Sequence, residues 1–372
     1  MSLAQRIPSG GRVDWVDAAK GICIILVVMM HTTLGLEKSS GETGWMHAIV
    51  AFAQPFRIPD FFLISGLFLS LTIDRPWRLY LDRKVVHFLY FYILWVAIQF
   101  AFKGGFAILD GESAASILRS FAFSMVQPFG TLWFIYMLPV FFVVTKLFRN
   151  RPYLLLGIAV VLEIMPTNTE AVAQALGSFF GVTEVHHGWV LVDEFCARLV
   201  YFVAGYLFAT KIFDLATWAR ANIVCALVAL GAWAGINGGL VAAGFSSWPI
   251  VSLLLGAAGA VAIIVVASLT SRITALAPLL HAGANSIVVY LAFFLPMVMS
   301  RLVFLKFMPW LDAGTIAFIC TAIGVAAPLI GYAIIKRIGF GMFLFHRPDW
   351  AILPGTPWKS ERGPKAALQP AE

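Results

Sequence analysis

Charged side chains are scarce in this sequence of 372 residues: Asp, Glu, Lys and Arg make up 12% of it, whereas hydrophobic residues make up 60%. Soluble globular domains carry about twice that share of charged residues. An apolar excess of this size could not be buried in one water-facing fold, so we expect most of the chain to lie in lipid. At about 20 apolar residues per spanning helix, the length allows about ten helices with short loops. It excludes a sizeable soluble catalytic domain, a Rossmann module and an extracellular disulfide scaffold.

Cysteines and catalytic motifs are also few. The four cysteines lie singly in apolar stretches without metal-ligand spacing, and we interpret them as small buried hydrophobic residues: Cys23, Cys196, Cys225 and Cys320. The sequence has no GxSxG, HExxH or Walker A motif. The net charge of +7 is not gathered into a basic stripe interleaved with aromatic residues, which argues against nucleic acid. We expect no metal site, no permanently bound cofactor and no nucleic-acid partner.

Apolar runs bounded by polar residues, glycine or proline predict ten membrane spans. They fall near residues 18–36, 48–72, 85–103, 129–148, 153–167, 189–210, 221–241, 248–270, 281–304 and 313–337. The fold class is therefore all-α, a polytopic integral membrane helical bundle. We divide the chain into a cytoplasmic N-terminal segment (1–17), a transmembrane domain (18–337) and a flexible basic tail (338–372). Gly231, Gly235 and Gly239 recur at four-residue spacing, which favours close helix packing.

The distribution of Lys and Arg predicts the orientation, because cytoplasmic loops carry more of them. With the N-terminus in the cytoplasm and alternating spans, the inside connections and the tail receive most of the basic residues. The outside segments receive only five: Lys38, Lys103, Arg119, Arg301 and Lys306. Both termini are therefore predicted to be cytoplasmic.

Ionisable residues inside the first span are the first candidates for chemistry, because each costs at least about 2.5–3.5 kcal/mol at membrane depth. Lys20 and His31 are eleven residues apart, close to three helical turns. They are therefore expected on one face, roughly 16 Å apart along the axis. The alternative is a lysine that extends to the interface and a histidine that packs against a neighbouring helix.

The second and sixth spans carry further acid–base pairs. Arg57 and Asp60 follow Pro55, and proline breaks helix regularity, which membranes tolerate only beside protein or a wet cavity. Glu194 and Arg198 are spaced i,i+4, so each pair could neutralise itself as a structural ion pair. Together with His31 they are predicted to line an outward-opening polar cavity.

Basic residues also gather in the first inside loop, where positive-inside topology accounts for Arg75 and Arg78. Arg83 and Lys84 stand at the foot of the third span. That position also suits contact with an anionic ligand.

The order and spacing of several segments resemble the membrane-bound acyltransferase 3 family over most of residues 13–337. These segments are residues 17–31, 56–66, 83–84, 131–136, 198–206 and 283–291. The first helix in that family carries an Arg, ten residues and then an essential His; here Lys20 takes the Arg position before His31. In many relatives the last segment ends with another His, where this chain has Phe293.

This resemblance implies transfer of an acyl group, acetyl or succinyl, from cytoplasmic acyl-CoA. The implied acceptor is a sugar hydroxyl of a cell-surface or periplasmic glycan or glycolipid, and the implied location is the bacterial inner membrane. Acyl-CoA would be a co-substrate, and the other partners would be the acceptor and the lipid bilayer.

Roles for the candidate residues follow from this implied reaction. His31 would be a general base or a covalent acyl carrier, oriented by Asp60 or Glu194. The oxyanion or acceptor side would be formed by Arg57, Arg198, Trp133 and Tyr136. Acyl-CoA would be bound by Lys20, Arg83 and Lys84. The alternative is a transporter or flippase of a glycolipid or small solute, with His31 and the acids as a proton relay.

Overall fold

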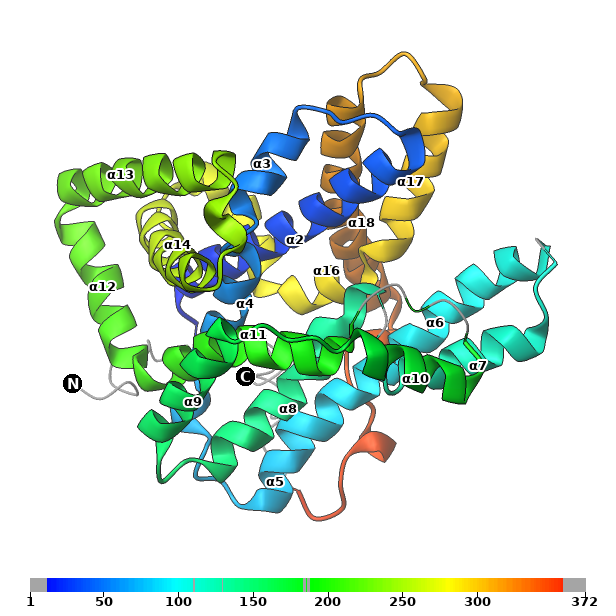
Figure 1. The fold of residues 1–372 in the computed structure, drawn as a ribbon, viewed down its shortest axis with the longest axis horizontal. Helices are drawn as coiled ribbons and strands as arrows, with labels where there is room; N and C mark the ends of the chain where they lie inside the picture. The colour runs from blue at the N-terminus through cyan, green and yellow to red at the C-terminus, as the bar shows by residue number, and fades with distance from the viewer. Residues whose placement is uncertain (1–11, 110, 129, 183–184, 186–187, 357–372) are drawn as a thin grey trace. The chain divides into compact units, whose positions relative to one another are not determined.

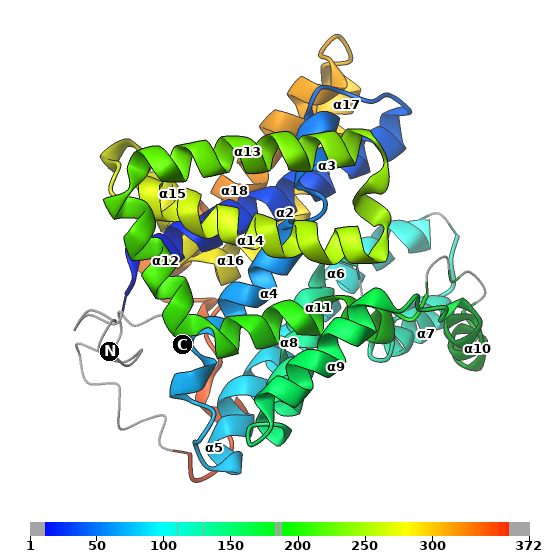
Figure 2. The same cartoon turned by 60° about the vertical axis from the view of Figure 1, so that its left-hand side comes forward.

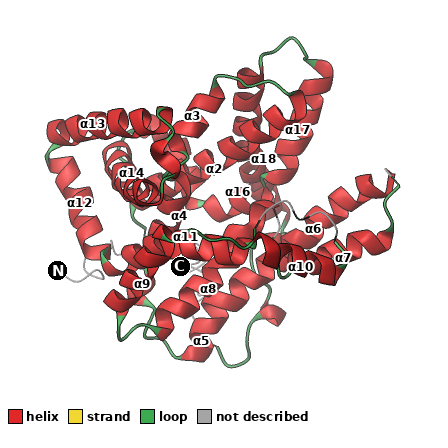
Figure 3. Cartoon of the chain, in the orientation of Figure 1, coloured by secondary structure: helices red, strands yellow, loops and turns green. Residues whose placement is uncertain are grey.

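A computed structural model describes residues 12–109, 111–128, 130–182, 185 and 188–356. Within these ranges every regular element is a helix and no strand occurs (Figure 3), so the predicted all-α class is confirmed. The chain divides into two compact units. One comprises Met1–Leu71, Tyr201–Gly339 and Pro364–Glu372, and the other comprises Thr72–Val200 and Phe340–Gly363.

The helices of the first unit are arranged around α2 (Asp14–Ser40), which runs through their middle in Figures 1 and 2. α2 packs against α4, α14, α15 and α18. The other helices are α3 (Met46–Ala53), α4 (Arg57–Leu67), α12 (Ala209–Ala221), α13 (Ile223–Ala242), α14 (Pro249–Thr270), α15 (Ala277–Ala284), α16 (Ser286–Ala292), α17 (Phe294–Phe307) and α18 (Ala313–Ile338). The end of α11 (Val190–Leu207) also belongs to this unit.

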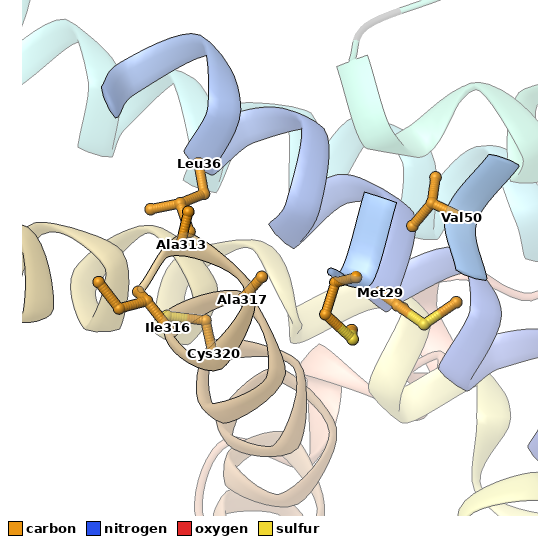
Figure 4. Close-up of a cluster of buried hydrophobic side chains, with 8 residues drawn as sticks. Met29, Leu36, Val50, Ala313, Ile316, Ala317 and Cys320 are labelled. Carbon is orange, nitrogen blue, oxygen red and sulfur yellow. The ribbon is translucent and has the colours of Figure 1, made fainter. Parts of the chain in front are cut away.

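Close packing around α2 depends on glycine and on buried apolar residues. A Cβ atom at Gly283 of α15 would collide with the backbone carbonyl oxygen of Asp17, so only glycine permits this helix crossing. Toward the other end of α2, a buried apolar cluster joins α2, α3 and α18 (Figure 4). Its members are Met29, Leu36, Met46, Val50, Ala313, Ile316, Ala317 and Cys320. α2 is thus fixed on several sides, which gives its polar residues defined positions.

The second unit is also helical. It contains α5 (Trp77–Leu81), the π-helical turn η2 (Asp82–Val86), α6 (His87–Leu109), α7 (Ala114–Ser124), α8 (Trp133–Leu147), α9 (Pro152–Ile164), α10 (Glu170–Phe180) and the first part of α11. Two tyrosine hydroxyls form hydrogen bonds between its segments. Tyr80 donates to the carbonyl oxygen of Phe142 at 2.7 Å, and Tyr92 donates to that of Ser124 at 2.5 Å.

Six helical stretches in the described part of the chain are long and apolar enough to span a membrane: Asp14–Ser40, Trp77–Gly105, Gly130–Leu147, Ile223–Ala242, Pro249–Thr270 and Ala313–Ile338. Three further pairs qualify as bent spans, with breaks of 49°, 76° and 62°, which gives up to nine. A polytopic membrane bundle is therefore confirmed. The count of ten and the cytoplasmic placement of both termini stay predictions.

Three sequence-based expectations differ from the structure. A Cβ atom at Gly231, Gly235 or Gly239 would meet nothing within 4 Å, so these glycines do not mediate close helix packing. Cys225, expected to be buried, is exposed on α13. Arg347, which lies in the tail predicted to be flexible, is buried. Residues 1–11 and 357–372, which hold parts of the predicted terminal segments, lie outside the described residues.

Candidate active site

α2 carries Lys20 and His31 on one uninterrupted helix. Acidic residues in its first turn stabilise the helix because they interact with the positive end of its dipole. The helix ends at Gly41, which adopts the left-handed conformation at φ 75°. The eleven-residue spacing therefore places both side chains on one face, roughly 16 Å apart along the axis. Each is half-buried.

The imidazole of His31 has an aromatic ring and a cation nearby. Its ring centroid is 5.5 Å from that of Phe293, which is fully buried. The guanidinium of Arg57 is close enough to act electrostatically on His31. The Phe293 ring therefore packs directly against the imidazole.

Arg57 is positioned by the helix break at Pro55. The N–H of Gln54 bonds to the carbonyl of Ala51 instead of the carbonyl one residue earlier, and Pro55 has no N–H to donate. The carbonyl oxygen of Val50 is left for Arg57, whose Nη1 donates to it at 3.1 Å. The break predicted from the prolines thus creates the acceptor that holds this guanidinium.

Asp60 does not form the predicted ion pair with Arg57. It is 1% exposed, and neither carboxylate oxygen has a hydrogen-bond partner among the described residues. It also forms no hydrogen bond with His31 and lies within electrostatic range of the Cys23 thiol. Cys23 precedes His31 by about two turns, roughly 12 Å along α2. The carboxylate is thus buried beside the helix of His31 with its hydrogen-bonding capacity unused.

Arg301, which the sequence predicts in an outer segment, contributes a cation beside α2. Its guanidinium packs against Gly35, where a Cβ atom would collide with it. Gly35 follows His31 by four residues and therefore lies on the same face of α2. The Nε atom of Arg301 is buried and has no hydrogen-bond partner within the described chain. A charged residue in an apolar helix costs free energy, and this cost is the sequence signal that could have marked Arg301 as a candidate.

The Glu194–Arg198 pair of α11 is confirmed. Nε of Arg198 donates to a carboxylate oxygen of Glu194 at 2.9 Å, with 22% and 27% of the two side chains exposed. The helical i,i+4 spacing brings the side chains together.

The aromatic candidates begin α8 in the same unit. Tyr136 donates its hydroxyl to the carbonyl oxygen of Met125 at 3.0 Å and packs its ring on Tyr92 at 4.9 Å. The Trp133 ring is half-buried, 6.5 Å from that of Phe134. Tyr136 therefore ties α8 to the chain after α7.

Arg83 and Lys84 lie in the π-turn η2 at the start of α6. Lys84 is buried, with its ammonium 4.9 Å from the ring centroid of Phe142. The residue before them, Asp82, forms an ion pair with Arg347 at 2.6 Å in which both side chains are 0% exposed. No local sequence pattern indicates this pair, because 265 residues separate its members.

The candidates thus fall into two groups. The first unit brings Lys20, His31, Arg57, Asp60 and Arg301 to or beside α2. The second unit holds Arg83, Lys84, Trp133, Tyr136, Glu194 and Arg198. A single cavity lined by residues of both groups stays a prediction. In the part of the chain that the structure describes, no cluster of three or more His, Cys, Asp or Glu side chains could hold a metal ion.

Comparison with known proteins places this arrangement in context. A family model, acyltransferase 3, described as an acyltransferase domain, matches residues 13–333. The chain is 26% identical over 208 residues to the inner membrane protein YcfT of Escherichia coli K12, covering 45% of this chain and 56% of that protein. It is 32% identical over 157 residues to the nodulation protein NolL of Sinorhizobium fredii NGR234, covering 40% of this chain and 41% of that protein. The chain thus aligns with only about half the length of these relatives. No solved structure matches it.

Proposed function

This chain belongs to the acyltransferase 3 family, and from that premise we propose that it is an acyl-CoA-dependent O-acyltransferase. The proposed donor is cytoplasmic acetyl-CoA or succinyl-CoA. The proposed acceptor is a sugar hydroxyl of a cell-surface or periplasmic glycan or glycolipid, and the proposed location is the bacterial inner membrane. One observation carries the proposal: Lys20 and His31 share one face of a continuous helix, and Arg57 lies beside His31.

The spacing on α2 suits a long, thin thioester. Lys20 would attract the phosphates of acyl-CoA, and the pantetheine arm is about as long as the three turns to His31. The nucleotide would stay at the inner end while the thioester carbonyl reaches the imidazole. We assign this chemistry to the transmembrane domain, residues 18–337.

His31 supports two routes of transfer. As a general base, it takes the proton of the acceptor hydroxyl while that oxygen attacks the thioester carbonyl; the C–S bond then breaks, and the CoA thiolate receives the proton. As a covalent carrier, its ring nitrogen attacks the carbonyl and CoA leaves as the thiolate; the acceptor hydroxyl then attacks the acyl carbon, the bond to the imidazole breaks, and the hydroxyl proton passes to the thiolate. Both routes pass through a tetrahedral oxyanion, and Arg57 is the nearby cation suited to stabilise it.

Two carboxylates remain candidates for orienting the imidazole. Asp60 would have to move toward His31, and its unused hydrogen-bonding capacity leaves it available for that role. Glu194 already binds Arg198, so it would act as part of that pair.

The test is transfer of label from acetyl-CoA or succinyl-CoA to extracted glycans and lipids in membranes that contain the protein. Wild-type protein and His47→Ala are expected to transfer label, because His47 is exposed and pairs with Glu37. His31→Ala is expected to insert normally and to transfer none. Label transfer by His31→Ala would contradict the catalytic role of His31. Solute uptake driven by a pH gradient, without label transfer, would contradict the proposal that the protein is an acyltransferase.

A further inference from the structure

The C-terminal part of the described chain is anchored to α6 of the second unit. Residues 341–353, called the strap below, offer backbone carbonyls to two aromatic side chains of that helix. The hydroxyl of Tyr90 donates to Phe343 at 3.0 Å, and the indole N–H of Trp95 donates to Leu344 at 3.0 Å. The strap is therefore a packed element of this unit.

Asp82 is the point at which the strap meets the π-turn η2. Nη2 of Arg347 donates to its Oδ2 at 2.6 Å, and Nη1 donates to its backbone carbonyl oxygen at 2.8 Å. The backbone N–H of Leu353 donates to Oδ1 at 2.9 Å. The strap thus satisfies both carboxylate oxygens of a side chain with 0% exposure.

The shared carbonyl links the strap to the local helix geometry. In a π-turn the hydrogen bond spans five residues, and here the N–H of His87 bonds to the carbonyl oxygen of Asp82. The same oxygen accepts the hydrogen bond from Arg347. π-turns are rare and occur frequently at functional sites. The guanidinium of Arg347 therefore binds the same carbonyl oxygen of Asp82 whose hydrogen bond with His87 sets the register of η2.

Positive charge converges on this turn. Arg83 and Lys84 are part of η2, and Arg347 and Lys84 lie within electrostatic range of His87. Nδ1 of His87 is buried and has no hydrogen-bond partner among the described residues. A buried polar atom without a partner is an exception that calls for an explanation, and an oxygen of a bound anion would satisfy it.

We propose that Arg347 is a positioning residue for the donor site: by holding Asp82 it fixes the π-turn in the register that presents Arg83 and Lys84 to the phosphates of acyl-CoA. This inference rests on the proposed function. It assigns to the strap a part in donor binding rather than in transfer, so its loss should weaken donor binding and leave the turnover step unchanged.

The test compares Arg347→Lys, which keeps the charge but loses the bidentate fork, with Asp82→Asn, which keeps the side-chain shape. Phe340→Ala is the matched control, because Phe340 is 80% exposed in the same part of the chain. Binding of coenzyme A to purified full-length protein is measured by calorimetry, and hydrogen exchange is followed across residues 82–87. We expect about a tenfold weaker affinity for both variants, consistent with loss of a charged hydrogen bond, and faster exchange in η2. KM for acyl-CoA should rise by a similar factor without a change in kcat.

The outcomes separate the inference from the function on which it rests. Folded variants with unchanged CoA affinity and unchanged exchange in η2 overturn the positioning role. Wild-type protein that binds no CoA refutes the donor assignment itself, whatever the strap does. If Asp82→Asn does not fold, Arg347→Lys alone decides, since it retains the buried positive charge.

Discussion

Asp60 and Asp82 are two buried acids with opposite surroundings. Asp82, in the second unit, is 0% exposed by side chain and receives hydrogen bonds from Arg347 and Leu353. Asp60, in the first unit, is 1% exposed and receives none within the described residues. A buried polar group without a hydrogen-bond partner costs free energy, whereas one with partners costs much less. The paired acid therefore fits a structural role, and the unpaired acid fits a role in chemistry.

Removing the paired acid should have the largest effect on stability. Asp82→Ala leaves the buried guanidinium of Arg347 without its carboxylate, and breaking such a pair costs about 3–5 kcal/mol. We expect a marked decrease in the thermal unfolding midpoint in detergent and a low yield of folded protein. An unchanged midpoint would show that the pair does not stabilise the second unit.

Asp60→Asn should have the opposite profile. The amide has nearly the same shape as the carboxyl group and breaks no hydrogen bond of the described residues, so the unfolding midpoint should stay about constant. Acyl transfer should decrease by about tenfold or more, as expected for loss of a group that orients a catalytic base. The two quantities are measured on the same preparation; a lower midpoint with full activity would make Asp60 structural instead.

A smaller effect is expected for the partly exposed pair on α11. Glu194→Gln removes one charge from an i,i+4 pair, which contributes about 0.2–0.5 kcal/mol. The unfolding midpoint should therefore change little. If Glu194→Gln lowers the midpoint as much as Asp82→Ala does, then the difference in exposure between the Glu194–Arg198 and Asp82–Arg347 pairs does not determine how much each pair stabilises the protein.

The smallest effect concerns Asp312, which caps α18 outside the spanning segments. Hydrogen bonds from Thr315 hold the pKa of this carboxyl below its usual range, and the backbone N–H of Thr315 donates to it at 3.0 Å. The stabilisation is therefore present above the unfolded-state pKa and is lost as the pH falls through the folded-state pKa. Asp312→Ala should slightly lower the unfolding midpoint at neutral pH and make no difference under strongly acidic conditions. A pH-independent difference would contradict this origin.

The sequence predicted the fold class because apolar runs long enough to span a membrane are visible in it, and it predicted the arrangement on α2 from the spacing of two residues. Lys20 and His31 share a face simply because their spacing is close to whole turns of one helix. Glu194 and Arg198 pair for the same reason. Prolines likewise predicted the broken second span, since proline lacks an N–H.

Helical spacing does not predict the partner of a side chain where a break in the backbone or a distant segment of the chain supplies that partner. Arg57 and Asp60 have suitable helical spacing, but the break frees the carbonyl of Val50, which takes the guanidinium instead. The Asp82–Arg347 pair joins positions 265 residues apart, and no periodicity encodes such a contact. The distribution of basic residues indicates only an outer segment for Arg301, whereas in the structure its guanidinium lies beside α2 in the space that Gly35 leaves open.

The most direct test of the account is single-turnover transfer of labelled acetyl groups from acetyl-CoA by purified His31→Gln protein. Glutamine keeps hydrogen-bonding capacity and has comparable bulk, but its amide does not accept a proton near neutral pH and does not carry an acyl group. We expect normal folding and a rate at least about a hundredfold below wild type, the usual contribution of a positioned acid–base group. Transfer at the wild-type rate would contradict the assignment of the chemistry to His31.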